Sequence, residues 1–177
     1  VSKDGNKILL TMAPSDQPDV HIYDLRTKSL QKITQYSGVD VNAQFVENEK
    51  KIVFVSDRLG YPNLFIQTIG GSDPKQLVWH GRNNTAVSTY QNYIVYSSRE
   101  PEQKGVFNIY LMSTQSDYIR QLTANGKNLF PRFSSDGGSI VFIKYLGETT
   151  ALGVIRVNAN KSFHYPLKLG KILSIDW

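Results

Sequence analysis

Short apolar runs separated by polar turns recur along the chain at nearly regular intervals, which is the pattern of a repeat protein. Four runs align on an isoleucine, with steps of 44, 42 and 46 residues between successive copies. An aromatic residue or a valine stands seven positions before each isoleucine. The isoleucines are Ile8, Ile52, Ile94 and Ile140, and the preceding residues are Val1, Phe45, Val87 and Phe133.

Each of these runs is followed by a second and a third run of strand-forming residues, and no window shows helical periodicity. The second runs read HIYDL, NLFIQ, NIYLM and LGVIRV, and the third read LQKIT, PKQLVW, YIRQLT and HYPLKL. Continuously apolar cores indicate strands that are covered on both faces. Repeats of about 40 to 50 residues that hold four short strands are typical of β-propeller blades.

The pattern therefore predicts an all-β fold, a β-propeller with about four four-stranded blades in this chain. We expect one propeller domain over 1–177, with blades at about 1–36, 37–80, 81–124 and 125–170 and a closing strand at 171–177. The closing segment KILSIDW aligns Trp177 with Phe45 and Phe133, like the first strand of a further copy. It could complete a first blade that lacks its own first strand. Either four blades close into a ring, or the chain belongs to a larger ring.

Two of the predicted turns contain Asp-Gly, namely Asp4-Gly5 in SKDGNKI and Asp136-Gly137 in SSDGGSI. Glycine accepts positive φ without steric cost, so these pairs suit tight hairpins. The second turn also resembles the Asp-box of sialidase-type propellers. That motif has the spacing S-x-D-x-G, whereas glycine follows Asp136 directly here, so we prefer the hairpin interpretation.

Composition narrows the function classes further. The net charge is +5, but the 20 basic residues are scattered, so we expect no nucleic-acid partner. The absence of cysteine excludes disulfides and thiolate metal sites. The chain has no run of about 18 apolar residues, so we expect no transmembrane segment. Its first residues, VSKDGNKILL, do not resemble a signal peptide.

Candidate catalytic chemistry is sparse. There is no G-x-S-x-G nucleophile motif, and the three histidines, His21, His80 and His164, fall in different repeats without metal-site spacing. The stretch FVSDRLGYPNLF at 54–65 holds a Ser-Asp-Arg triplet, but other copies repeat half of the triplet or none of it. We expect no enzyme activity, no metal and no cofactor, and we interpret the triplet as structural or contact residues of a blade.

The loops that lead from one blade to the next carry the candidate binding residues. They read TQYSGVDVN, WHGRNNTAV, TANGKNLFPR and LKLGKILS, and they are rich in Gly, Asn and basic residues. Propeller topology would gather such loops at one mouth of the central channel, where a rigid scaffold can present them to a partner. Gly and Asn are also ordinary turn formers, so a binding role and a purely structural role both stay open.

The repeats resemble those of the TolB family, the periplasmic propeller proteins of the bacterial Tol-Pal envelope system. The resemblance rests on FVSDRLGYPNLF followed by TIGGSDPKQLVWHGRNN, on NIYLMSTQSDYIRQLT, on FPRFSSDGGSIVF and on the ending HYPLKLGKILSIDW, and it covers essentially the whole chain. It implies a six-bladed propeller preceded by a smaller α/β domain, with this chain as the C-terminal portion. The turns VENEKK and STYQNY depart from the family's usual Pro-Asp-Gly turn.

The resemblance further implies a periplasmic, non-enzymatic binding scaffold whose partners are other Tol proteins and Pal, a peptidoglycan-associated lipoprotein bound at the channel mouth. Carried over by position, the contacting loops are residues 37–42, 80–84 and 125–132. The basic residues among them would complement an acidic partner surface. The candidate partner-binding residues are Ser37, Gly38, Asp40, Asn42, His80, Arg82, Asn83, Asn84, Asn125, Lys127, Asn128 and Arg132.

A rival interpretation is the propeller of a tricorn- or prolyl-peptidase-type hydrolase, which would gate substrate access to a catalytic domain elsewhere. An incomplete ring would also leave sheet edges and faces uncovered, so self-association is expected if the ring is incomplete.

Overall fold

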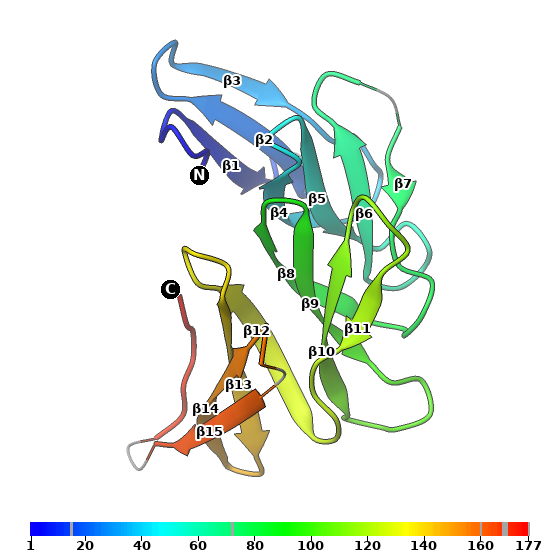
Figure 1. Ribbon diagram of the computed structural model, residues 1–177. Helices are drawn as coiled ribbons and strands as arrows, with labels where there is room; N and C mark the ends of the chain where they lie inside the picture. Colours follow the sequence, from blue (N-terminus) through cyan, green and yellow to red (C-terminus); the bar gives the residue numbers. More distant parts are fainter. Residues whose placement is uncertain (15, 72, 160, 168–169, 177) are drawn as a thin grey trace. The chain divides into compact units, whose positions relative to one another are not determined.

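The computed structural model describes residues 1–14, 16–71, 73–159, 161–167 and 170–176, and all regular structure in these residues is β-strand. The all-β prediction is therefore confirmed. The chain divides into two compact units, Val1–His80 and Gly81–Trp177, which we call unit 1 and unit 2 and describe separately. Unit 1 runs from blue to blue-green in Figure 1, and unit 2 runs from green to red.

Unit 1 contains a three-stranded antiparallel sheet in the order β1-β2-β3 and a four-stranded antiparallel sheet in the order β4-β5-β6-β7. Val20 of the first sheet packs with Ile52, Phe54 and Phe65 of the second to form the core. The strands are β1 (Lys7–Met12), β2 (Asp19–Asp24), β3 (Ser29–Lys32), β4 (Asp40–Val46), β5 (Lys51–Ser56), β6 (Asn63–Thr68) and β7 (Lys75–Gln76).

Unit 2 contains two antiparallel groups, β8-β9-β10-β11 and β12-β13-β14-β15. One parallel residue pair, Phe107 with Lys127, joins β10 to β12 and merges the groups into one extended sheet. The strands are β8 (Asn84–Tyr90), β9 (Tyr93–Arg99), β10 (Phe107–Ser113), β11 (Ile119–Gln121), β12 (Lys127–Phe133), β13 (Ser139–Leu146), β14 (Thr149–Arg156) and β15 (Lys161–Pro166).

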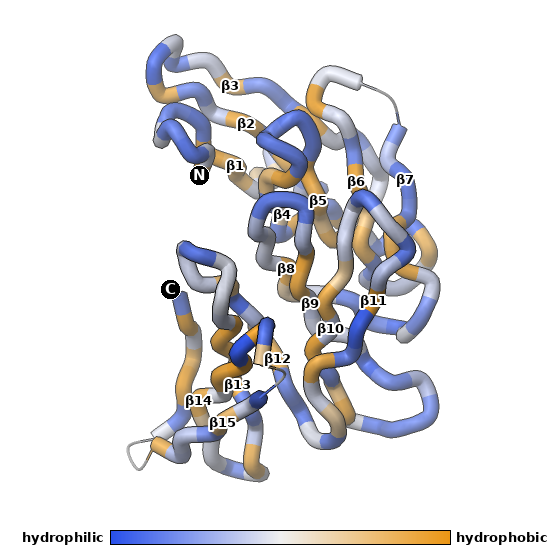
Figure 2. Tube along the Cα trace, viewed as in Figure 1, coloured by the Kyte–Doolittle hydropathy of each residue, from blue (hydrophilic) through white to orange (hydrophobic). Residues whose placement is uncertain are grey.

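The central strands are apolar on both faces, as the continuous runs predicted. In β5 the consecutive residues Val53, Phe54 and Val55 are all buried, and Figure 2 shows hydrophobic strand centres between hydrophilic turns. Packing in unit 2 is close enough to require a glycine in β14. A Cβ added to Gly153 would lie 2.2 Å from the ring of Phe142 on β13, so no larger residue fits without displacing that ring.

The seven-residue spacing found in the sequence corresponds to a cross-strand pair in two of the repeats but not in the third. Phe45 and Phe133 do lie opposite Ile52 and Ile140, but the residue opposite Ile94 is Thr89 rather than Val87. The cause is a shorter hairpin. Only two residues separate the paired ends of β8 and β9, whereas longer turns connect β4 with β5 and β12 with β13.

A β-bulge recurs at the same place in β4, β8 and β12, where the register shifts by one residue. Each bulge contains one residue with positive φ, at Asn42, Ala86 and Phe130, with φ of 55°, 55° and 56°. Such bulges bend a strand and increase its twist. The predicted Asp-Gly turns are confirmed, since Gly5 and Gly137 have φ of 72° and 71°.

The C-terminal segment differs from the predicted closing strand. Residues 171–176 form no strand, and the backbone N–H of Ile172 donates to Oγ1 of Thr150 at 2.7 Å. An isolated strand has no ladder partner, so a closing strand can form only where another strand is available to pair with it. Trp177 lies outside the described residues. The third run of the last repeat was predicted at HYPLKL, which begins at His164, whereas the strand β15 begins at Lys161.

Candidate functional site

At the start of β4, a buried carboxylate is neutralised by an arginine from the loop after β5. Asp40 is fully buried, and its two carboxylate oxygens accept hydrogen bonds from Nη2 of Arg58 at 3.1 and 3.0 Å. Nε of Arg58 donates to Oγ of Ser56 at 2.8 Å, and Ser56 pairs with Asp40 across the two strands. Because a buried charge is costly unless it is paired and hydrogen-bonded, these contacts hold the sheet together.

The guanidinium of Arg58 also lies over aromatic rings. Its Cζ atom is 4.9 Å from the ring centroid of Tyr36, 5.6 Å from that of Phe54 and 4.8 Å from that of Phe65. These rings cover the cation, whose side chain is 19% exposed, and cation–π attraction adds to the ion pair. The interpretation of the Ser-Asp-Arg stretch as structural residues is therefore confirmed for Ser56 and Arg58.

The other predicted residues of the 37–42 segment differ in exposure. A Cβ added to Gly38 would lie 2.4 Å from Oδ1 of Asp57, so packing requires glycine there. The same Oδ1 accepts the backbone N–H of Val39 at 2.9 Å. Asn42 occupies the β4 bulge, whose positive φ favours asparagine over most residues. Ser37 is exposed.

The corresponding end of β8 and β9 in unit 2 uses different chemistry. Asn84 is fully buried and pairs with Ser98 across the two strands. Two residues after that serine stands Glu100, at the position that the arginine holds in unit 1. Its Oε1 accepts hydrogen bonds from the hydroxyl of Tyr110 at 2.6 Å and from Nδ2 of Asn108 at 3.3 Å. Burial and this carboxylate raise the pKa of Tyr110.

Asn128 at the start of β12 stabilises the preceding loop. Its side chain is buried, and its Nδ2 donates to the backbone carbonyl oxygens of Phe107 and Asn125, at 3.1 and 3.0 Å. Asn125 itself has φ of 67°, a conformation that asparagine tolerates well. The amide therefore fixes the loop to the neighbouring strand β10.

Backbone hydrogen bonds place the 81–84 and 125–128 segments at the same end of the unit 2 strands. The N–H of Arg99 donates to the carbonyl oxygen of Asn83 at 3.1 Å, and Arg99 pairs with Phe107. The N–H of Phe107 in turn donates to the carbonyl oxygen of Gly126 at 2.9 Å. These parts of the predicted segments 80–84 and 125–132 are thus joined through β9 and β10.

Two predicted basic residues at this end are exposed. Arg82 and Lys127 lie in the two joined segments, and the ammonium of Lys127 is 4.6 Å from the ring centroid of Tyr145. Arg132 differs, because it is partly buried near the other end of β12 and Nη1 donates to the carbonyl oxygen of Pro131 at 3.0 Å. Burial lowers the pKa of Arg132, while the carboxylate of Asp176 acts in the opposite direction.

The three histidines are dispersed. His21 is buried with Nδ1 3.1 Å from the carbonyl oxygen of Asp19, and His164 packs edge-on against Phe142 at 5.9 Å between ring centroids. His21 is therefore enclosed within unit 1, whereas His164 is exposed on β15. His80 is partly exposed beside Trp79, whose side chain is 77% exposed.

Among the described residues, no group of three or more His, Cys, Asp or Glu side chains could hold a metal ion. The same part of the chain contains no helix long and apolar enough to cross a membrane.

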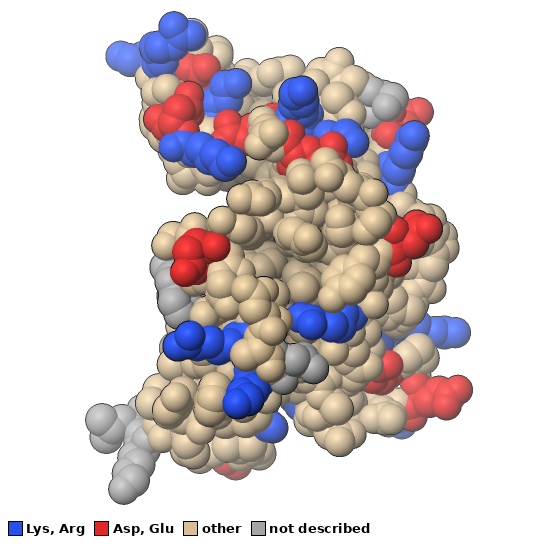
Figure 3. All heavy atoms as spheres, viewed as in Figure 1, with Lys and Arg blue, Asp and Glu red and all other residues tan. Residues whose placement is uncertain are grey.

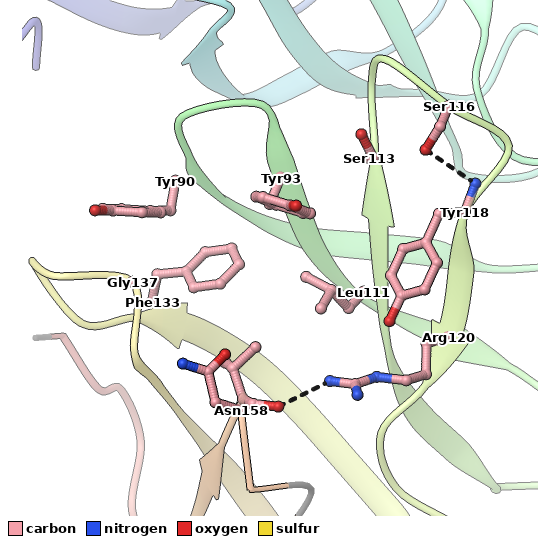
Figure 4. A pocket seen from close by; sticks show the side chains of 11 residues that line it. Tyr90, Tyr93, Leu111, Ser113, Ser116, Tyr118, Arg120, Phe133, Gly137 and Asn158 are labelled. Carbon is pink, nitrogen blue, oxygen red and sulfur yellow. Dashed lines mark hydrogen bonds between the residues drawn. The ribbon is translucent and has the colours of Figure 1, made fainter.

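One feature of unit 2 has no counterpart among the sequence predictions. A cavity of about 480 Å³ lies among the turns at the other end of the same strands (Figure 4). Three tyrosines and one phenylalanine are among its lining residues, and Arg120 extends into it. The sequence signal was weak because these residues come from four separate turns.

Comparison with known proteins identifies the repeats. A family model described as the TolB beta propeller domain matches residues 1–177. The Tol-Pal system protein TolB of Campylobacter jejuni (strain RM1221) is 70% identical over 178 residues, which cover 100% of this chain and 44% of that protein. The protein of the same name from Wolinella succinogenes is 54% identical over 181 residues, covering 100% of this chain and 43% of that protein. The chain thus spans less than half the length of these relatives.

Solved structures agree on the fold. The crystal structure of TolB from Acinetobacter baumannii superposes with a TM-score of 0.85 at 23% identity, covering 99% of this chain and 44% of that one. A puromycin-hydrolyzing peptidase of Mycobacterium tuberculosis superposes with a TM-score of 0.71 at 10% identity, covering 98% and 29%. At these identities the likeness concerns the propeller fold alone, so the peptidase gives the rival interpretation no functional support.

Proposed function

The chain belongs to the TolB β-propeller family, and from that premise we propose that it is part of a non-enzymatic scaffold of the Tol-Pal system that docks a Pal-like lipoprotein in the periplasm. Relatives 70% and 54% identical over the whole chain carry the Tol-Pal name. The observation that supports the docking site is the pair of exposed cations, Arg82 and Lys127, at one end of a rigid set of strands. Other Tol proteins are further proposed partners.

The proposed assembly is a larger ring, of six blades, to which this chain contributes four. The sheets β1–β3 and β4–β7 and the groups β8–β11 and β12–β15 are the four proposed blades. Two features support this division. The bulges in β4, β8 and β12 recur at intervals of 44 residues, and a single parallel pair links the two groups of unit 2. The chain also spans 44% of the Campylobacter relative, which leaves room for further blades.

Within the proposed docking surface, exposed and buried residues have separate roles. We assign direct contact to Arg82 and Lys127, which present charge to solvent. We assign positioning to Asn84 and Asn128, which are almost fully buried at the starts of β8 and β12 of unit 2. Charges at the edge of an interface chiefly steer association, so the proposed partner presents acidic groups to this surface.

Calorimetric titration of the soluble domain of a Pal-like lipoprotein into the full chain tests the docking proposal. Charge reversal at Arg82 or Lys127 (R82E, K127E) is expected to weaken binding by about tenfold each, the loss of roughly 1.4 kcal/mol. The matched control is R26E, which reverses an exposed arginine in the β2–β3 turn. Unchanged affinity in both R82E and K127E, with unfolding transitions intact, would refute the assigned surface.

Self-association is a separate proposal. The outer strand β15 leaves Phe163 and Tyr165 exposed, at 47% and 54%, on a sheet face of the kind that propellers cover with a neighbouring sheet. We expect the full chain to form concentration-dependent dimers or larger species in sedimentation velocity runs. A single monomeric species across the concentration range would contradict this expectation.

A further inference from the structure

The cavity in unit 2 lies at the strand ends opposite those of the proposed docking surface. The docking end is marked by the pairs Asn84 with Ser98 and Phe107 with Arg99. At the other ends of the same strands, Tyr93 pairs with both Tyr90 and Ser113. The cavity is bounded there by the β8–β9, β10–β11, β12–β13 and β14–β15 turns. Any ligand of this cavity would therefore bind away from the proposed docking surface.

Aromatic rings form one wall of the cavity. The rings of Tyr90 and Phe133 have centroids 6.0 Å apart, and Figure 4 shows Tyr93 and Leu111 continuing this side toward β10. Gly137 makes the arrangement possible, because an added Cβ would lie 2.3 Å from the ring of Tyr90. The close packing of this aromatic wall therefore depends on the glycine of the β12–β13 turn.

The opposite wall presents the guanidinium of Arg120, which forms no ion pair with any residue that the structure describes. Nη2 of Arg120 donates to the carbonyl oxygen of Val157 at 3.1 Å, and within the described part of the chain this is the hydrogen bond that the guanidinium makes. Its Nε atom is buried without an acceptor among the same residues. Figure 4 shows the side chains of Tyr118 and Asn158 flanking the guanidinium.

No acidic side chain lines the cavity among the described residues. Asp136 is next to the lining residue Gly137, and its Oδ1 accepts hydrogen bonds from Oγ of Ser134 at 2.5 Å and from the N–H of Gly138 at 2.9 Å. Asp117 lies in the exposed β10–β11 turn and makes no ion pair with the arginine. Figure 3 shows that the visible surface over β8–β11 is mostly uncharged, whereas acidic and basic side chains are interspersed over unit 1.

We propose that this cavity binds a carboxylate carried beside an aromatic ring, the chemistry shared by a peptide that ends in phenylalanine and by a free aromatic acid. Arginine donors recognise carboxylates in a fixed planar geometry, which supplies the anchor at Arg120. Aromatic walls bury a ring in offset or edge contacts, which supplies the pocket beside Tyr90 and Phe133. A volume of about 480 Å³ lies within the range of small-ligand sites, about 300–1,000 Å³.

The test compares N-acetyl-Ala-Ala-Phe with its C-terminal amide by calorimetric titration of the full chain. The free acid should bind about tenfold or more tightly than the amide, because only the acid pairs with the guanidinium. The variant R120Q should remove this preference, whereas the control R26Q, in an exposed turn of unit 1, should keep it. Equal affinity for acid and amide in the unmodified chain, absence of binding, or a preference that survives in R120Q would overturn the proposal.

A second variant covers the case in which R120Q fails to fold. Tyr93 continues the aromatic wall and is 43% exposed, so Y93A should leave unfolding unchanged while weakening both acid and amide by a similar factor of several-fold. Unchanged binding by Y93A would overturn the proposed aromatic contact. Titration with 3-phenylpropionate separates the two sources of ligand. Affinity equal to that of the peptide supports a free aromatic acid, and affinity tenfold weaker supports a peptide end.

Discussion

The strand ends at β4–β5 in the sheet β4–β7 of unit 1 and at β8–β9 in the group β8–β11 of unit 2 occupy corresponding places, yet they are stabilised in opposite ways. In unit 1 the first residue of β4 is Asp40, and Arg58 neutralises its buried carboxylate. In unit 2 the first residue of β8 is Asn84, whose buried side chain is a neutral amide. Glu100, which corresponds to Arg58, instead accepts a hydrogen bond from the hydroxyl of Tyr110 on β10.

The difference shows which polar residues are built into the scaffold. A buried charge at the start of β4 requires an opposite charge after β5. A neutral amide at the start of β8 has no such requirement, so the residue after β9 can make a different hydrogen bond. Asp40 and Asn84 are both among the predicted partner-binding residues, and both are fully buried, so neither presents its side chain to solvent. Arg82 and Lys127 are exposed instead, and Lys127 also lies over the ring of Tyr145.

The largest effect is expected from breaking the unit 1 ion pair. The substitution Arg58→Ala leaves the carboxylate of Asp40 buried without its partner, which should cost about 3–5 kcal/mol of unfolding free energy. Denaturant unfolding of the full chain measures this cost. The double variant D40N/R58A should recover part of the loss, because an amide replaces the unpaired charge. A single-variant cost below about 1 kcal/mol would show that the pair is not structural.

A smaller effect is expected in unit 2 from Glu100→Gln. The amide weakens the acceptor for the hydroxyl of Tyr110, so the unfolding free energy should fall by about 1.5–3 kcal/mol. The matched control Glu102→Gln lies in the exposed turn between β9 and β10 and should change stability by less than about 0.5 kcal/mol. Equal effects of the two substitutions would contradict the assigned role of Glu100.

The same contact predicts a pH dependence. Burial, and to a smaller extent the hydrogen bond to Glu100, raises the pKa of Tyr110 in the folded state. Burial likewise raises the pKa of Tyr96. A raised folded pKa contributes stability that is complete below the unfolded value of about 10 and is lost as the pH rises above it. Tyrosinate absorbance should therefore appear at higher pH in the folded chain than in the unfolded chain. Glu100→Gln should move the Tyr110 titration back toward its ordinary range, and an unmoved titration would contradict the hydrogen bond.

The smallest effect on folding is expected for the exposed cations. Charge reversal at Arg82 or Lys127 should change the unfolding free energy by less than about 0.5 kcal/mol, because neither side chain makes an ion pair within the described residues. The same variants should still weaken binding of the proposed partner. A stability loss comparable to that of Arg58→Ala would mean that these residues also belong to the scaffold.

The sequence was sufficient for the features that depend on local pattern. Repeated apolar runs predicted the strands, and the Asp-Gly pairs predicted two hairpin turns because glycine is needed at positive φ. The bulges could not be predicted, since Asn42, Ala86 and Phe130 share no chemistry and sheet geometry sets their conformation. The two-residue hairpin after β8 was missed for a similar reason, because several turn lengths fit one apolar spacing.

The candidate site was only partly predictable. The segments 81–84 and 125–128 do share one end of the unit 2 strands, as the topology suggested. Sequence could not distinguish exposed Lys127 from buried Asn128, since burial is decided by the loop's bonds to β10. The cavity at Arg120 could not be predicted from the sequence, because its lining residues are far apart in the chain.

Amide hydrogen exchange of the full chain, with and without the soluble domain of a Pal-like lipoprotein, tests most directly which strand ends meet the partner. Our account predicts added protection in residues 81–84 and 125–128 and no change in the turns 113–118 and 136–138. Protection confined to those turns, or none in residues 81–84 and 125–128 at saturating partner, would contradict it.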